Sequence, residues 1–219
     1  SRLIQTGAVT EGQTAALAYG LLLVLVPAGL LLATRTAAGV LLLGMAGLLL
    51  AWAYSAPPLR LMARGLGELA VAGAWFLVVL GSDYVQRRQF FATPASAALS
   101  LALLVAALLL INGCPDAAAD AAVGKRTLAV RLGPEGAAWA YLGLVLAAHG
   151  WLAVSVGLRL APGAALWGLL ALPLSLAAVA LLQRHARQPQ RLKPALALTV
   201  AATLLHGLGM AAEIGRAHV

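Results

Sequence analysis

The segment TPASAALSLALLVAALLLIN, residues 93–112, decides the fold class of this chain, because all 20 of its residues are uncharged. A helix rises about 1.5 Å per residue, so a run of this length crosses the ~30 Å hydrocarbon core of a membrane. Thr93 is a good N-cap, and Pro94 suits the first helical position, where an N–H has no partner in any case. We therefore predict a transmembrane helix from Thr93 to Asn112.

The rest of the chain has the same character. Of its 219 residues, 62% are hydrophobic and 10% are charged, and the mean hydropathy is +0.93. An ordinary soluble domain carries about 25% charged residues, so a water-soluble globule is excluded. We predict an all-α, polytopic transmembrane helical bundle. Proline, glycine and basic residues bound seven apolar spans, which are Thr10–Ala33, Thr36–Tyr54, Gly67–Val85, Thr93–Asn112, Pro134–Val156, Pro162–Gln183 and Pro194–Ile214.

Lys and Arg number 15 against 7 Asp and Glu, and the basic residues lie between the apolar runs. In a soluble protein this excess would raise the question of nucleic acid, but next to a membrane it sets the topology. We expect membrane lipid and phosphorylated substrates as partners, and no nucleic acid. The single cysteine, Cys114, excludes an internal disulfide.

Seven spans place successive loops on alternate sides of the membrane. One side then holds ten basic residues, namely Arg2, Arg60, Arg64, Lys125, Arg126, Arg131, Arg184, Arg187, Arg191 and Lys193. The other side holds five, namely Arg35, Arg87, Arg88, Arg159 and Arg216. By the positive-inside tendency, we expect the first side to face the cytoplasm.

The segment that follows residues 93–112 holds two of the seven acidic residues, Asp116 and Asp120. They are four residues apart, so on a helical turn both carboxylates face the same way. Asn112, one turn earlier, adds a third oxygen ligand. Mg²⁺ prefers such hard oxygen ligands and is usually held by one or two carboxylates together with substrate phosphates. We predict that Asp116, Asp120 and Asn112 bind Mg²⁺, with Asn112 also contacting the substrate.

Lys125 and Arg126 follow this acidic pair within two helical turns. A basic pair there would contact phosphate oxygens that the metal leaves uncoordinated, which indicates a diphosphate ligand. The alternative is that the acidic and basic pairs form a solvated ion network in a loop, which would contribute little.

A second polar segment on the same side runs from Tyr54 to Glu68. Arg60 and Arg64 could contact a second face of a phosphate group, and Glu68 at a helix start is favoured by the helix dipole. An ordinary basic loop between two helices is the alternative for this segment. The functional interpretation gains support because both polar segments face the same side.

Several stretches, taken in order, resemble the UbiA-type membrane prenyltransferases. They are YSAPPLRL (54–61), RGLGE (64–68), GSDYVQ (81–86) and INGCPDAAADAAVGKRTLAVRLG (111–133). Within that family they look most like the 1,4-dihydroxy-2-naphthoate polyprenyltransferase branch. Some members place a lysine where this chain has Pro58, so Tyr54 carries over as a catalytic residue and Arg60 would be its basic partner.

The resemblance implies a single transmembrane prenyltransferase domain over residues 1–219, within a bundle of about nine helices. It also implies two Asp-rich motifs that together bind Mg²⁺ and an isoprenyl diphosphate. The chain contains the second motif, at Asn112, Asp116 and Asp120, and we expect the first motif and its two helices before Ser1. The expected location is a bacterial inner membrane, with the site facing the cytoplasm.

The implied activity is Mg²⁺-dependent transfer of a prenyl group from a polyprenyl diphosphate to an aromatic acceptor, namely 1,4-dihydroxy-2-naphthoate in menaquinone biosynthesis. Asp116, Asp120, Lys125, Arg126 and Tyr54 would be catalytic. Hydroxybenzoate, homogentisate, a chlorophyllide and haem remain alternative acceptors. A non-catalytic relative or a transporter of a phosphorylated lipid is the alternative from another functional class.

Overall fold

The computed structural model of this chain describes residues 7–214, which form helices and their connections and contain no strand. The all-α prediction is confirmed. Residues 1–6 and 215–219 lie outside the described residues, and with them Arg2 and Arg216 of the loop count.

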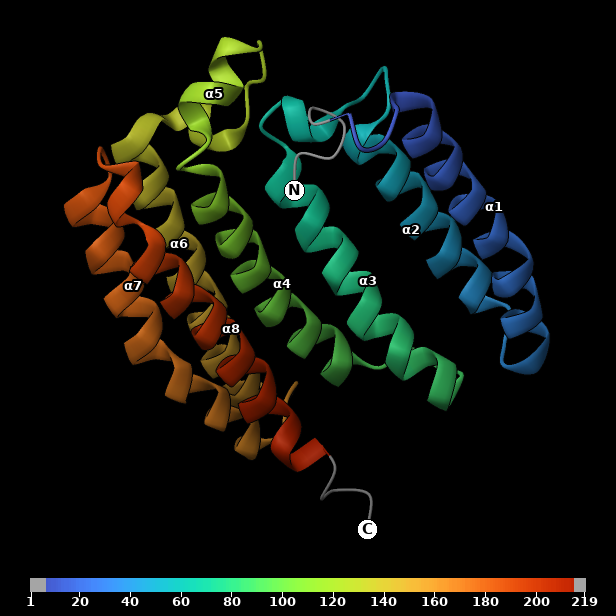
Figure 1. The fold of residues 1–219 in the computed structure, drawn as a ribbon. Coiled ribbons are helices and arrows are strands. Elements are labelled where there is room, and N and C mark those ends of the chain that lie inside the picture. Colours follow the sequence, from blue (N-terminus) through green and yellow to red (C-terminus); the bar gives the residue numbers. More distant parts are fainter. Residues whose placement is uncertain (1–6, 215–219) are drawn as a thin grey trace.

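The long helices stand side by side in an open arc, with α1 and α2 at one edge and α7 and α8 toward the other (Figure 1). Short helices connect them at the ends. In chain order the elements are α1 (Glu11–Arg35), α2 (Gly39–Ser55), η1 (Leu61–Ala63), α3 (Gly67–Arg87), α4 (Ala92–Gly113), α5 (Ala117–Ala122), α6 (Leu128–Gly157), η2 (Gly163–Ala171), α7 (Leu172–His185), η3 (Pro189–Arg191) and α8 (Lys193–Ile214).

Each of the seven predicted spans coincides with helical structure. Within residues 7–214, six helical segments are long and apolar enough to cross a membrane, and the second predicted span corresponds to the shorter α2, with 17 residues. At about 1.5 Å per residue, α2 is about 26 Å long, close to the thickness of a hydrocarbon core. The chain is therefore a polytopic helical membrane protein.

The core is centred on α4, the helix predicted from residues 93–112. It packs against α3, α6 and α8, and half of its 22 residues are buried. Small side chains dominate these contacts, because Ala98 and Ala107 of α4 and Ala148 of α6 have no exposed surface. Small residues let helix backbones approach closely, which is how helices associate inside a membrane. By contrast, α1 buries none of its residues.

The sixth predicted span, Pro162–Gln183, is divided in the structure into the 3₁₀ helix η2 and the α-helix α7. Pro173 has no N–H to donate to the carbonyl of Leu169, and the amide of Leu172 donates to that carbonyl instead. The carbonyl of Gly168 then accepts a hydrogen bond from Nδ1 of His206 in α8, at 3.0 Å. This hydrogen bond joins η2 to α8.

The fifth span begins with a break at Gly133. This residue has φ of 68° and interrupts α6 immediately before Pro134. Thr127 caps the short first part of α6, because its hydroxyl accepts a hydrogen bond from the Val130 amide at 3.4 Å. The break lets the first turn of α6 lie at the end of the bundle, where α5 and η1 also lie (Figure 1).

Candidate functional site

The two polar segments of the sequence meet at one end of the bundle. The amide of Arg126 donates a hydrogen bond to the carbonyl of Ala63 at 2.9 Å, which joins the segment after α5 to η1. Figure 1 shows α5 and the α2–α3 connection at the same end. The turn between α7 and α8 lies at this end too, so the described residues of the predicted ten-residue basic side are on one face.

Asp116 and Asp120 lie on one helical turn, as their spacing predicts. Asp116 is the N-cap of α5, and its carbonyl accepts a hydrogen bond from the Asp120 amide at 2.8 Å. The Asp116 side chain is exposed and that of Asp120 is half-buried. Two carboxylates on one helical turn at the solvent-exposed end of the bundle can bind a divalent cation.

Asn112 and the two aspartates lie on different elements in the structure. Asn112 is exposed on the last turn of α4, and the chain turns before α5 begins. Pro115 lacks an N–H, so it cannot donate to the carbonyl of Ile111, which accepts from the Cys114 amide instead. Asn112 and the two aspartates therefore reach this end of the bundle from separate elements.

Lys125 contacts the acidic pair directly, because its Nζ lies 3.1 Å from Oδ1 of Asp120. The local cause is the turn that ends α5. Gly124 has φ of 75°, its amide donates to the carbonyl of Ala121, and the amide of Lys125 donates to the carbonyl of Asp120. This is the Schellman pattern of a helix C-terminus, and it turns the chain back so that Lys125 returns to Asp120.

Arg126 and Arg131 bring further positive charge to the same end. Arg126 is exposed, and its carbonyl accepts a hydrogen bond from Nε of Arg131 at 3.1 Å. The Arg131 side chain lies over Gly65, where a Cβ would be 2.6 Å from its Cδ. Gly65 has φ of 73°, so glycine is required here both for its conformation and for the space.

Arg60 and Arg64 have different environments in the α2–α3 connection. Arg60 is exposed and has φ of 43°, immediately before η1. Nη2 of Arg64 donates to the carbonyl of Pro58 at 2.6 Å, so this guanidinium stabilises its own loop. Of the two arginines predicted to bind phosphate, Arg60 is thus exposed, whereas Arg64 already donates a hydrogen bond within its own loop.

Tyr54 and Glu68 lie beneath this surface at the helix ends. Tyr54 is half-buried, and a Cβ at Gly67 would lie 3.7 Å from Cε2 of its ring. Glu68 is in the first turn of α3 and is also half-buried. Burial raises the pKa of the Cys114 thiol to about 11, and the negative charge of Glu68 contributes to this shift. Glu68 is therefore near the end of α4.

Several residues of this surface are not apparent from the sequence alone. Arg131 enters the sequence analysis only as one of ten basic residues, although it joins Arg126 to Gly65. Glu135 forms an ion pair with Arg187, which links α6 to the α7–η3 turn. The sequence signal for these contacts is limited to the glycines at positions 65 and 124, which adopt the left-handed conformation that favours glycine. Neither position indicates which side chain lies against it.

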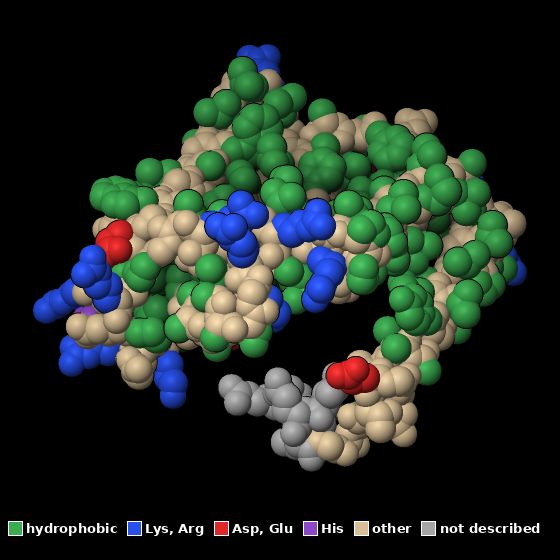
Figure 2. Space-filling model, turned by 90° about the horizontal axis from the view of Figure 1, so that it is seen from above, with side chains coloured by type: hydrophobic (Ala, Val, Ile, Leu, Met, Phe, Trp, Pro, Cys, Tyr) green, Lys and Arg blue, Asp and Glu red, His purple; other side chains and the backbone are tan. Residues whose placement is uncertain are grey.

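The charges at this end suit an anionic ligand. Figure 2, which looks onto this end of the bundle, shows Lys and Arg side chains gathered near its middle and at one edge, with few acidic ones. Among the described residues, no group of three or more His, Cys, Asp or Glu side chains could hold a metal by itself. Two carboxylates beside cations instead suit a cation that a phosphorylated ligand helps to hold.

The fold and this surface define an integral membrane protein with a basic surface at one end of its helical bundle. The sequence model of the UbiA prenyltransferase family matches residues 1–211. The chain therefore belongs to the UbiA prenyltransferase family, and its class of activity is prenyl transfer.

Three similar proteins carry the name 1,4-dihydroxy-2-naphthoate octaprenyltransferase. The chain is 32% identical to the one from Mycobacterium tuberculosis over 216 residues, which are 98% of this chain and 70% of that protein. It is 33% identical to the one from Mycobacterium leprae over 69% of this chain and 51% of the relative. It is 34% identical to the one from Haemophilus influenzae over 67% of this chain and 49% of the relative. The chain thus spans about half the length of the latter two. No solved structure matches the chain significantly.

Proposed function

We propose that this protein transfers a prenyl group from a polyprenyl diphosphate to 1,4-dihydroxy-2-naphthoate, in a Mg²⁺-dependent step of menaquinone biosynthesis. The observation that carries the proposal is the turn that holds Asp116 and Asp120 beside Lys125 and Arg126. The names of the three relatives support the naphthoate acceptor.

The residues at this site fit a magnesium ion by donor type and arrangement. Asp116 and Asp120 supply hard carboxylate oxygens from a single helical turn, and Asn112 supplies an amide oxygen at the same end of the bundle. Mg²⁺ typically keeps several waters and takes its remaining ligands from substrate phosphates. When bound, it would supply positive charge that neutralises the diphosphate.

The basic side chains perform the complementary task. Lys125, Arg126 and Arg60 donate hydrogen bonds to the diphosphate oxygens, and Lys125 exchanges part of its contact with Asp120 for the substrate. These charges stabilise the leaving group most strongly as the allylic C–O bond breaks. The bond electrons leave with the diphosphate, and the prenyl group becomes an allylic carbocation.

The second half of the reaction takes place against the apolar helices. The electron-rich ring of the acceptor donates an electron pair to the carbocation and forms the new C–C bond. The ring then loses CO₂ from the carbon that carried the carboxylate, or a proton from an unsubstituted carbon. Apolar walls exclude water that would otherwise capture the carbocation. Tyr54, half-buried at the end of α2, is proposed to bound this space beneath Arg60.

The site is proposed to face the cytoplasm of a bacterial inner membrane. The support is the distribution of basic residues, because nine of the 15 Lys and Arg lie in the α2–α3, α4–α6 and α7–α8 connections or in the helix ends that adjoin them. This orientation is tested by introducing a cysteine or a protease site into the α4–α6 connection. Its reaction with an added thiol reagent or protease is then assayed in intact cells.

The decisive experiment uses membranes that contain the full-length gene product. Labelled polyprenyl diphosphate is supplied with Mg²⁺ and, separately, with dihydroxynaphthoate, hydroxybenzoate or homogentisate. Product formed only with dihydroxynaphthoate supports the proposal, and product with another acceptor overturns the acceptor alone. Absence of product with the whole panel, in membranes that bind the labelled diphosphate, favours a non-catalytic relative.

A further inference from the structure

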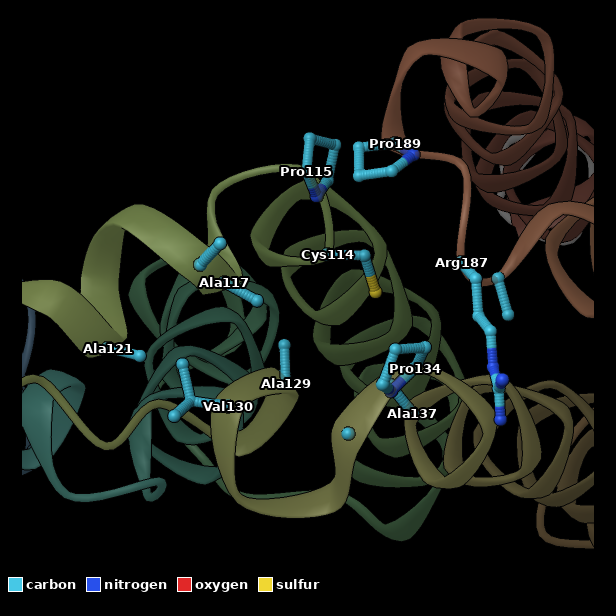
Figure 3. A pocket seen from close by; sticks show the side chains of 13 residues that line it. Cys114, Pro115, Ala117, Ala121, Ala129, Val130, Pro134, Ala137, Arg187 and Pro189 are labelled. Atoms are coloured by element: carbon cyan, nitrogen blue, oxygen red, sulfur yellow. The ribbon is translucent and has the colours of Figure 1, made fainter.

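A cavity of about 300 Å³ opens beside α5, and neither Asp116 nor Asp120 is among the residues that line it (Figure 3). Its walls come from the end of α4, from α5, from the first turns of α6 and from the α7–η3 turn. This volume lies at the lower end of the range found for small-molecule sites. None of the side chains proposed to bind Mg²⁺ or the diphosphate lines this cavity.

The faces of α5 separate the cavity from the aspartates. Ala117, Ala118 and Ala121 line the cavity. At about 100° per residue, these three positions point roughly a third of a turn away from Asp116 and Asp120. The short helix α5 is therefore a wall between two different surfaces.

The lining explains why the space stays open. Apart from Arg187, the lining consists of small apolar residues, three prolines and Cys114. Gly133 lies in the lining with φ of 68° and has no neighbour within 4 Å of the position of a Cβ. The rigid rings of Pro115, Pro134 and Pro189 border the cavity, and Arg187 is the one long side chain in its lining (Figure 3).

Arg187 gives this apolar cavity one charged group. Its side chain is 80% exposed, and its Nε forms an ion pair with Oε1 of Glu135. A guanidinium has five N–H donors, so this contact leaves others for a ligand. The segment from Arg184 to Lys193 contains four Lys and Arg residues and no acidic one, so its net charge stays positive beside Glu135.

We propose that this cavity binds a small apolar carboxylic acid, with its hydrocarbon body among the alanines and prolines and its carboxylate on Arg187. The pairing of a planar guanidinium with a carboxylate gives two parallel hydrogen bonds and fixes the orientation of the ligand. The apolar lining favours a ring system over a polar metabolite because burial of apolar surface supplies most of the binding free energy. The site is distinct from the diphosphate site.

Cys114 provides a readout that does not depend on prenyl transfer. It is the only cysteine in the chain, and it lines the cavity. The protein is placed in phosphatidylcholine nanodiscs, and alkylation of Cys114 by N-ethylmaleimide is followed by mass spectrometry with increasing 2-naphthoate. We expect 2-naphthoate to slow the alkylation in a saturable way, and the neutral analogue 2-naphthalenemethanol to require a higher concentration.

Two pairs of variants make the test specific. Arg187→Gln should weaken the protection by 2-naphthoate at least about tenfold, the factor expected for loss of a charge-assisted hydrogen bond. Arg184→Gln, in the same basic segment but outside the lining, should leave it unchanged. Ala118→Leu, which fills the cavity, should abolish saturable protection, whereas Ala119→Leu on another face of α5 should retain it. Glu135→Gln should strengthen binding, because it removes the carboxylate that competes for Arg187.

Three outcomes would overturn the proposal. The first is alkylation that 2-naphthoate does not slow at millimolar concentration. The second is equal protection in the Arg187→Gln variant, which would place the acid elsewhere. The third is protection by phosphatidylglycerol in the nanodisc where 2-naphthoate gives none, which would assign the surface to a lipid head group.

Discussion

The amide of Arg126 lies 2.9 Å from the carbonyl of Ala63 and donates a hydrogen bond to it. This single contact connects the segment after α5 to the α2–α3 connection, and Arg131 reinforces it by donating to the Arg126 carbonyl while lying over Gly65. The two polar segments of the sequence therefore form one surface, and the strength of this junction can be measured.

Gly65→Ala should weaken the junction. An added Cβ would lie 2.6 Å from Cδ of Arg131, and the residue would keep a left-handed conformation that costs a non-glycine residue about 1–2 kcal/mol. We expect lower thermal stability and a higher KM for the diphosphate. Gly133→Ala is the matched control, because Gly133 has a similar φ of 68°, has no neighbour within 4 Å and lies outside the turn that holds Lys125. Equal effects on KM would mean that the Arg131 contact has no role in substrate binding.

Asp116→Asn and Asp120→Asn should each reduce prenyl transfer by about 10²–10³-fold, as expected when a group that stabilises transition-state charge is lost. Both variants should also need more Mg²⁺ for half-maximal activity, because each loses one carboxylate ligand. Titration of activity with Mg²⁺ after treatment with EDTA measures this. Glu135→Gln serves as the control, since this exposed carboxylate pairs with Arg187 and lies outside the turn that holds Asp116 and Asp120. Near-normal turnover in both Asp variants would contradict the proposed metal site.

Lys125→Met should raise the KM for the diphosphate and lower the rate by about 10–100-fold, because it removes a cation from the leaving group. Lys125→Arg should recover part of the loss. The alternative for this region is a solvated ion network between Lys125 and Asp120, and it predicts a stability change of less than about 1 kcal/mol with unchanged kinetics. Initial rates over a range of diphosphate concentrations distinguish the two.

Gly209→Ala should destabilise the bundle strongly. A Cβ there would lie 2.6 Å from both C and O of Trp167 and 2.7 Å from N of Gly168, all backbone atoms of η2 that cannot move independently. Overpacking of this kind typically costs about 1–3 kcal/mol or more. Gly207→Ala, whose added Cβ would have its nearest contact at 3.8 Å, should be neutral or slightly stabilising. Thermal unfolding in detergent compares the two, and equal melting temperatures would show that η2 does not pack this closely on α8.

The thiol of Cys114 should react slowly at neutral pH. Its pKa is raised to about 11 by burial and by the charge of Glu68, and only the thiolate is a good nucleophile. In Mg²⁺-free buffer, the alkylation rate should increase about tenfold per pH unit up to roughly pH 11. A free thiol in the unfolded chain should level off near pH 9. An early plateau in the folded protein would contradict this environment for Cys114.

The sequence by itself determines the parts of this protein that depend on local spacing. Seven apolar runs predict the membrane helices, because a helix in lipid must satisfy its backbone hydrogen bonds within its own segment. The four-residue spacing of Asp116 and Asp120 predicts their shared turn for the same reason, since a helical repeat is a local property. The Gly-Lys pair after α5 contains the C-terminal signal that returns Lys125 to Asp120.

Only the tertiary structure decides the relations between distant segments. The Ala63–Arg126 junction and the position of Arg131 over Gly65 depend on how α2, α3 and α6 pack, which no local pattern encodes. The same holds for η2, which divides a span predicted as one helix. There Nδ1 of His206 in α8 donates a hydrogen bond to the carbonyl of Gly168. The turn at Pro115 likewise places Asn112 on α4 and the two aspartates on the next element. Hydrogen bonds within a helix follow from the chain itself, whereas contacts between helices follow from the shapes that meet, and those shapes exist only in the folded bundle.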